Sequence, residues 1–190
     1  MNEKIYIENP TKELYNTVKW LKNNSSTDKA RITLNGFNIR DNGLLIESSN
    51  GVGLVFSKLT APLSVYHEKL TSGIWFVDTC TKKLIVLQEI HGNFPDTNAI
   101  ITVYENTKDR FVESLVSFKP EFILPVISGF DHVNFNIISD VKPIQIVLRD
   151  DYMNRKFLDG TYIAVLMPHK NRDDNVSFDY IQNQFAQIKL

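Results

Sequence analysis

Hydrophobic and polar positions follow a helical spacing in three parts of the chain. The predicted helices span Pro10–Asn23, Lys119–Phe130 and the end of Asn171–Leu190. In the first, hydrophobic residues recur every three or four positions, as they do on the buried face of a helix. Pro120 suits the first turn of the second, because an N–H there has no helical partner to lose. The third has one apolar face, which packs either onto its own core or onto a second copy.

The other hydrophobic runs are short and alternate with polar residues, which is typical of half-buried β-strands. Asp41-Asn42-Gly43 and Asn50-Gly51 separate such runs, and these residue types favour tight hairpin turns. Strands are predicted at Arg31–Asn38, Leu44–Glu47, Val52–Ser57, Gly73–Thr79, Lys83–Ile90, Ile100–Glu105, Phe111–Phe118, Val133–Ile138, Pro143–Leu148 and Thr161–Met167. Polar turns lie at Cys80–Lys82 and Asp150–Gly160. Short helices that precede runs of strands indicate an α+β fold with antiparallel sheets.

The composition predicts a soluble globular protein and argues against several functions. The chain has 190 residues, of which 43% are hydrophobic and 23% charged, so it can bury a sizeable core. Its net charge of -1 argues against a generally basic nucleic-acid binder, and contact with DNA would need a local patch of Lys and Arg. Met1–Asn9 lacks the apolar core of a signal peptide, and Phe122–Ile127 is too short to span a bilayer. A single cysteine, Cys80, also fits a cytoplasmic protein.

Residues that usually perform catalysis or bind metals form no recognisable constellation. The four histidines share no metal-ligand spacing with one another or with Cys80. Asp150-Asp151 and Asp173-Asp174 lie in predicted polar loops, where carboxylates are usually solvated. Gly51-Val52-Gly53 is too short for a phosphate-binding loop. We therefore predict no catalytic residue, no metal and no cofactor, and an unrelated enzyme with an α+β fold is the least favoured alternative.

Five segments resemble, in order, parts of the bacterial DNA sliding clamp, the β subunit of DNA polymerase III. They are Ile32–Gly36 (ITLNG), Glu47–Leu54 (ESSNGVGL), Gly92–Ile100 (GNFPDTNAI), Phe118–Gly129, and Asp140–Ile144 (DVKPI) followed by Tyr162–Lys170 (YIAVLMPHK). The last two are the most specific, because a helix, a Lys-Pro strand and a Met-Pro ending occur together at suitable spacing. The resemblance touches most of residues 10–170. It implies a DNA-clamp-like fold, shortened relative to the family's three domains, and a phage- or plasmid-encoded version is one interpretation.

The resemblance also implies a division of the chain. Residues 1–92 are similar to a shortened second domain of the family, and residues 93–170 to the linker and the second half of the third domain. Residues 171–190 form an additional C-terminal tail with a predicted helix. The family's first domain has no counterpart here. Closing a ring would therefore need a different number of subunits or a different interface.

The family binds partner proteins through short Gln-Leu-x-Leu-Phe-type peptides, in an apolar groove between its second and third domains. The matching positions here are Leu34, Gly51, Val52, Leu54, Pro95, Ile100, Phe122, Pro143, Val165 and Met167. Nearly all are apolar, which suits peptides that anchor by a few apolar side chains. Val52-Gly53 stand where the family has His-Arg, so a polar wall is missing. The alternative is that these residues are ordinary core.

The resemblance further implies a basic inner face that contacts DNA. The candidate residues are Lys12, Lys19, Lys22, Lys29 and Arg31. Lysines on the first predicted helix can share one face, although that face could equally be a solvated surface.

Taken together, these features predict a DNA replication accessory protein that binds DNA polymerase or other clamp-binding proteins and encircles double-stranded DNA, independently of sequence, as a homo-oligomer. The alternative is a clamp-fold interaction module that does not encircle DNA and acts as a decoy or regulator. In addition, Gln184–Leu190 resembles a clamp-binding peptide, which could fill the chain's own groove or a neighbour's.

Overall fold

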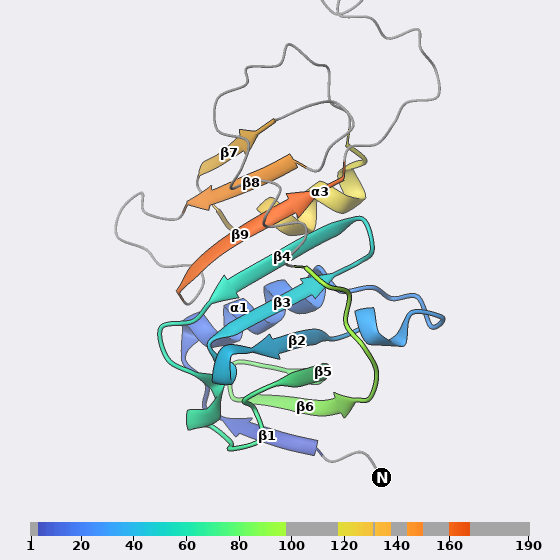
Figure 1. Ribbon diagram of the computed structural model, residues 1–190. Coiled ribbons are helices and arrows are strands. Elements are labelled where there is room, and N and C mark those ends of the chain that lie inside the picture. The colour runs from blue at the N-terminus through green and yellow to red at the C-terminus, as the bar shows by residue number, and fades with distance from the viewer. Residues whose placement is uncertain (1–3, 98–117, 131, 138–143, 150–159, 168–190) are drawn as a thin grey trace, which may run out of the picture.

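The computed structural model describes residues 4–97, 118–130, 132–137, 144–149 and 160–167. In these ranges, nine strands form one antiparallel sheet, and two α-helices pack on one of its faces (Figure 1). The predicted strand at Ile100–Glu105, nearly all of the one at Phe111–Phe118, and the tail helix lie outside the described residues. The α+β fold with antiparallel strands is confirmed.

The strands are β1 (Lys4–Glu8), β2 (Phe37–Arg40), β3 (Leu45–Ser49), β4 (Gly53–Lys58), β5 (Gly73–Cys80), β6 (Leu84–Ile90), β7 (His132–Asn136), β8 (Ile144–Arg149) and β9 (Thr161–Leu166). Their order in the sheet is β1-β6-β5-β2-β3-β4-β9-β8-β7, and every neighbouring pair is antiparallel. The helices are α1 (Lys12–Asn23) and α3 (Pro120–Ile127), and short 3-10 turns are η1 (Ile32–Leu34), η2 (Asp41–Gly43) and η3 (Leu63–Val65). Neither α-helix has the length and apolar character needed to cross a membrane.

Helix α1 forms where the hydrophobic spacing predicted it, but it begins at Lys12 rather than Pro10. Thr11 is the reason, because its side-chain oxygen accepts a hydrogen bond of 3.1 Å from the Leu14 N–H and so caps the helix. At the other end, the Asn24 side chain donates to the Trp20 carbonyl at 2.8 Å. The helix therefore has fixed ends and turns one apolar face to the sheet.

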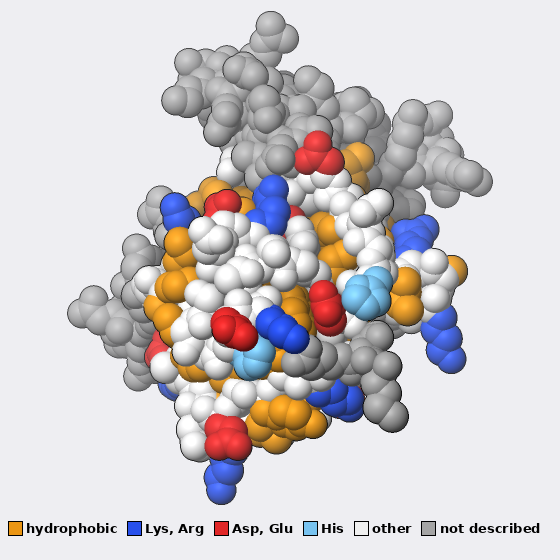
Figure 2. All heavy atoms as spheres, turned by 60° about the horizontal axis from the view of Figure 1, so that its bottom comes forward, with side chains coloured by type: hydrophobic (Ala, Val, Ile, Leu, Met, Phe, Trp, Pro, Cys, Tyr) orange, Lys and Arg blue, Asp and Glu red, His pale blue; other side chains and the backbone are white. Residues whose placement is uncertain are grey.

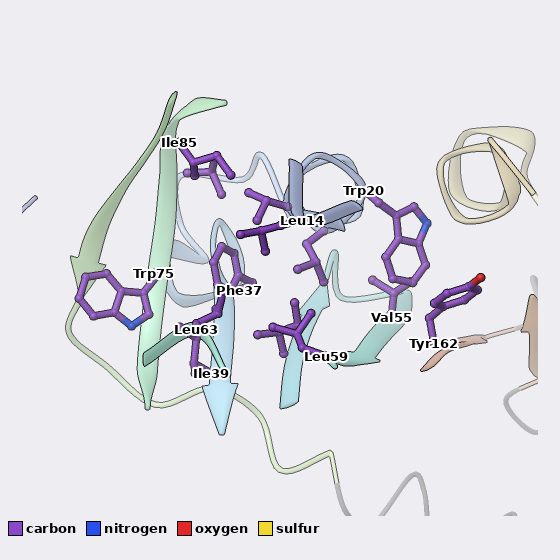
Figure 3. Packing of buried hydrophobic residues seen from close by; sticks show 14 of the residues in the cluster. Leu14, Trp20, Phe37, Ile39, Val55, Leu59, Leu63, Trp75, Ile85 and Tyr162 are labelled. Atoms are coloured by element: carbon purple, nitrogen blue, oxygen red, sulfur yellow. The ribbon is translucent and has the colours of Figure 1, made fainter. Parts of the chain in front are cut away.

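That face packs on alternate residues of the strands, which point to the same side of the sheet. Figure 3 shows Leu14 and Trp20 of α1 above Phe37, Val55 and other core residues. The Trp20 indole N–H also donates to the Val126 carbonyl of α3 at 3.0 Å. A single hydrophobic core therefore joins α1, α3 and both ends of the described chain.

Strands β4 and β9 connect the two segments that the sequence divides near residue 92. Their ladder runs from Gly53 opposite Leu166 to Lys58 opposite Thr161. Because β4 pairs with β9, the six strands β1 to β6 and the three strands β7 to β9 form one continuous sheet (Figure 1). The boundary between the two units stays a prediction.

The structure differs from the sequence prediction at three places. Arg31–Asn38 is not one strand: the Leu34 N–H donates to the Arg31 carbonyl at 2.9 Å, which closes a 3-10 turn, and β2 begins only at Phe37. The Asn35 side-chain amide stabilises this turn when its nitrogen faces nearby carbonyl oxygens, including that of Ser26 at 3.0 Å. Strand β1 was not predicted, and Cys80 belongs to β5 rather than to the following turn.

Candidate functional site

A small cleft lies where β4 and β9 pair. It has a volume of about 100 Å³ and is lined by Ser49, Gly51, Val52, Gly53, Leu54, Val165 and Met167. Leu54 and Val165 are buried and lie opposite each other across the ladder. Because the neighbouring Val55 and Ala164 belong to the core, these two side chains are on the sheet face opposite the helices. The cleft is thus an apolar hollow on the helix-free face.

The wall formed by the turn between β3 and β4 is held by its own hydrogen bonds. The Asn50 side-chain oxygen accepts from the Val52 N–H at 2.9 Å and from the Gly53 N–H at 2.8 Å. The Ser49 hydroxyl donates to the Gly53 carbonyl at 2.8 Å and accepts from the Gly51 N–H. A side chain entering this cleft would therefore meet a preformed wall rather than one that must be ordered.

Met167 forms the rim on the other side. Its backbone N–H donates to the Val52 carbonyl at 3.0 Å, which continues the β4–β9 contact beyond Leu166. Its side chain is 45% exposed although it is large and apolar. A fixed backbone with an exposed, adaptable thioether is well suited to cover an apolar side chain of a partner.

Arg31 and Leu34 adjoin the cleft at Gly51. This glycine has a φ of +88°, and a Cβ atom there would overlap the Arg31 Nη1 atom and contact Leu34 Cδ1 at 3.8 Å. The Arg31 side chain is more than half exposed, and its Nε lies 3.6 Å from the Asp28 carboxylate. The sequence assigned Arg31 only to a DNA-facing surface. No signal in the sequence pointed to this contact, because it depends on the 3-10 turn η1 and on the close approach that Gly51 permits.

The structure does not bring every predicted groove residue to this cleft. Phe122 is on α3, which packs on the opposite face of the sheet, and Pro95 is exposed on the segment that follows β6. Ile100 and Pro143 lie outside the described residues, as does the tail segment Gln184–Leu190. The cleft therefore unites Gly51, Val52, Leu54, Val165 and Met167, with Leu34 beside them.

The segment after β6 crosses the helix-free face and is fixed there by a buried carboxylate (Figure 1). Glu47 is 1% exposed, and it accepts hydrogen bonds from the Thr97 hydroxyl at 2.6 Å and the Asn38 side chain at 2.7 Å. The Arg40 Nε lies 3.1 Å from the same carboxylate. A charged and hydrogen-bonded cluster thus holds Thr97 against the sheet.

The predicted DNA-facing lysines are exposed. Lys12, Lys19 and Lys22 lie on α1, whose other face is buried on the sheet, and Lys29 lies in the loop that follows. The Lys19 Nζ is 5.9 Å from the centre of the Tyr15 ring. This exposure is a requirement for contact with DNA, and the contact itself stays a prediction.

Reactive groups do not gather in the described residues. In these ranges no three His, Cys, Asp or Glu side chains are grouped so as to hold a metal ion. Burial raises the pKa of the Cys80 thiol, and the nearby Lys22 and Lys19 only partly oppose this effect. A thiol with a raised pKa is a poor nucleophile at neutral pH. The arrangement around the cleft is suited to binding.

Comparison with known proteins adds the fold relationship. No protein-family model and no curated protein matches the sequence. The structure is similar to the DNA polymerase sliding clamp from Bacillus subtilis, with 14% identity, a TM-score of 0.52, and coverage of 90% of this chain and 65% of that one. The DNA polymerase III β subunit from Thermotoga maritima matches with 14% identity, a TM-score of 0.53, and coverage of 88% and 65%.

A third similar structure is the sliding clamp from Bartonella birtlesii bound to griselimycin. It has 15% identity and a TM-score of 0.52, with 88% of this chain and 66% of that chain covered. The resemblance predicted from the sequence is confirmed for the fold: the chain has a shortened fold of the bacterial sliding clamps. It spans about 65% of the length of the first clamps it matches.

Proposed function

We propose that this protein is a non-enzymatic, sliding-clamp-like DNA replication accessory protein that binds short segments of DNA polymerase or other partners in the β4–β9 cleft. One observation carries the proposal. Residues singled out from the sequence, from Gly51 to Met167, line one preformed apolar cleft on the helix-free face. The clamp fold supports the same conclusion, because the family resemblance implies a partner groove at these same positions.

The size of the cleft restricts what it binds. A volume of about 100 Å³ takes one apolar side chain rather than a drug-sized molecule. The rest of the partner segment would lie along the surface beside Met167 and Gly51. The buried Leu54 and Val165 provide the apolar floor, and the exclusion of water there would supply most of the affinity.

This binding can be tested with a fluorescently labelled Gln-Leu-Ser-Leu-Phe peptide. We expect micromolar affinity and a loss of at least about tenfold in Met167→Asp, because a carboxylate would be placed against an apolar site. Leu124→Asp is the matched control, since Leu124 is also a large exposed apolar residue, at 57%, but lies on α3 on the other face. Fluorescence polarisation measures both. Absence of binding, or an equal loss in the two variants, would remove the cleft from the proposal.

We further propose that the protein encircles double-stranded DNA as a homo-oligomer, with the exposed lysines of α1 facing the DNA. Among the described strands, β1 and β7 are the outermost of the sheet, and the proposed ring would join subunits at these two ends. The chain covers 65% of the Bacillus subtilis clamp that it resembles. The second candidate is a monomeric module that captures partner segments, because the β4–β9 cleft is formed within one chain and does not require a ring.

Solution mass and DNA affinity distinguish the two candidates. For a ring we expect a mass of several subunits by light scattering, and DNA binding that weakens about tenfold or more in Lys12→Glu/Lys19→Glu/Lys22→Glu, with a shallower salt dependence. Lys58→Glu/Lys82→Glu/Lys83→Glu makes the same change in charge at other exposed lysines and should have little effect. A monomer that binds the peptide but not DNA would establish the non-encircling module.

A further inference from the structure

Arg31 places a positive charge at the edge of the β4–β9 cleft. The described residues that line this cleft are Ser, Gly, Val, Leu and Met, and none of them is charged. Gly51 is one of these residues, and its missing side chain lets the guanidinium come close, because a Cβ there would overlap Arg31 Nη1. A group bound in the cleft would therefore have this guanidinium as a neighbour.

The backbone that carries Arg31 is held beside the turn between β3 and β4. The Arg31 N–H donates to the Asp28 carbonyl at 3.0 Å, and the Arg31 carbonyl accepts from the Leu34 N–H at 2.9 Å. Leu34 is buried, and its Cδ1 would lie 3.8 Å from a Cβ at Gly51. Both Arg31 and Leu34 thus lie against the same glycine, one with a charged and one with an apolar group.

Asp28 approaches a different part of the guanidinium. Its carboxylate lies 3.6 Å from Arg31 Nε, and both side chains are more than half exposed, so this ion pair contributes little. The Asp28 Oδ1 also accepts from the Ala30 N–H at 2.9 Å, which holds the carboxylate in its own loop. A guanidinium has five N–H donors in a planar fork. A second carboxylate can therefore pair with Arg31 on the side that faces Gly51.

The molecule as a whole does not attract acidic segments. Its net charge is -1. On the side of the described residues seen in Figure 2, Lys and Arg side chains are interspersed with Asp and Glu. A preference of the cleft for an acidic partner would therefore have to come from a cation close to it, rather than from a broad positive field.

We propose that Arg31 determines the specificity of the β4–β9 cleft by selecting partner segments that carry a carboxylate next to the apolar anchoring side chain. The inference rests on the proposed peptide-binding function. The apolar side chain would lie on Leu54 and Val165, and the adjacent carboxylate would accept hydrogen bonds from the guanidinium beside Gly51. The occupant is thus a segment of a partner protein in which a Leu or a similar residue adjoins an Asp or Glu.

Two labelled peptides, Gln-Leu-Asp-Leu-Phe and Gln-Leu-Asn-Leu-Phe, test this proposal on the full chain by fluorescence polarisation. The central residue adjoins both leucines, so the comparison does not depend on which leucine enters the cleft. Asn has the size of Asp without its charge. We expect the Asp peptide to bind about threefold to fivefold more tightly at low salt, with a smaller preference as salt is added.

Variants assign the preference to one side chain. Arg31→Met keeps an apolar stem of similar length, and it should bring the two peptides to equal affinity. Arg31→Glu should reverse the order, so that Gln-Leu-Lys-Leu-Phe binds more tightly than the Asp peptide. Lys82→Met is the matched control, because it removes one positive charge from an exposed lysine between β5 and β6, and it should leave the preference unchanged.

The outcomes separate this inference from the function on which it rests. Equal affinities of the Asp and Asn peptides for the unaltered protein would overturn the role of Arg31 and leave the cleft as an apolar site. A preference that persists in Arg31→Met, or an Arg31→Met variant that loses only affinity for DNA, would overturn it as well. If none of the peptides binds, the proposed function itself is wrong, and the inference falls with it.

Discussion

Replacing Glu47 with alanine is expected to lower the free energy of unfolding by about 3–5 kcal/mol. The carboxylate is 1% exposed and is the shared acceptor of Asn38, Arg40 and Thr97. Without it, the Arg40 guanidinium loses its ion pair next to a buried site, and the Thr97 hydroxyl loses its acceptor. Removing one partner of a buried pair is costly because the other keeps its desolvation penalty. Urea unfolding followed by circular dichroism measures the change.

Two further variants separate charge from hydrogen bonding at this site. Glu47→Gln keeps one acceptor oxygen and the shape of the side chain, so its effect should lie between zero and that of alanine. Glu68→Ala removes an exposed carboxylate and should change stability by no more than about 0.5 kcal/mol. If Glu47→Ala proved as mild as Glu68→Ala, the cluster would not be what holds the segment ending at Thr97 on the sheet.

The parts of the fold that the sequence predicted are those set by local patterns. The 3.6-residue spacing predicted α1, and the Asp41-Asn42-Gly43 turn joins β2 to β3 with positive φ angles of 51°, 56° and 90°. Pro120 does begin α3. Each of these signals depends on neighbouring residues alone. The overall fold was predictable for a different reason, since five family-like segments in order imply one arrangement.

The errors occur where distant residues determine the structure. Lys4–Glu8 is a strand because β6 pairs with it, and a charged segment at the start of the chain carries little independent strand signal. Arg31–Asn35 alternates like a strand, but local hydrogen bonds and the Asn35 amide hold it as a turn. Sheet pairing and side-chain caps of this kind are not encoded in periodicity.

In the candidate site, too, some residues were predictable and others depend on contacts between distant parts of the chain. Family resemblance pointed to Leu54, Val165 and Met167, whereas composition and spacing alone gave no reason to separate them from core. The resemblance also pointed to Phe122 as a groove residue. Phe122 lies on the helix-bearing face instead, and that position depends on how α3 packs, which the resemblance does not specify. The resemblance also did not place Arg31 at the rim, since that contact requires the close approach that Gly51 permits.

The second large effect on stability is expected at Gly160, which immediately precedes β9. Its φ is +78°, and a Cβ atom there would overlap the backbone carbonyl of Lys58, which cannot rotate away as a side chain could. The left-handed conformation adds about 1–2 kcal/mol for alanine, and overpacking adds about 1–3 kcal/mol. We therefore expect Gly160→Ala to lower the free energy of unfolding by about 3 kcal/mol, measured by urea unfolding.

Gly73→Ala separates the two contributions. Gly73 has a φ of +100°, but its Cβ would meet only the Trp75 Nε1 atom at 3.6 Å, an ordinary contact, so only the conformational part of about 1–2 kcal/mol applies. The β4–β9 ladder that starts at Lys58 and Thr161 ends at Gly53 and Leu166, beside the cleft. Gly160→Ala should therefore also weaken Gln-Leu-Ser-Leu-Phe binding, whereas Gly73→Ala should not. Equal stability losses and unchanged peptide affinity in both variants would mean that the cleft tolerates a shift of β9 against β4.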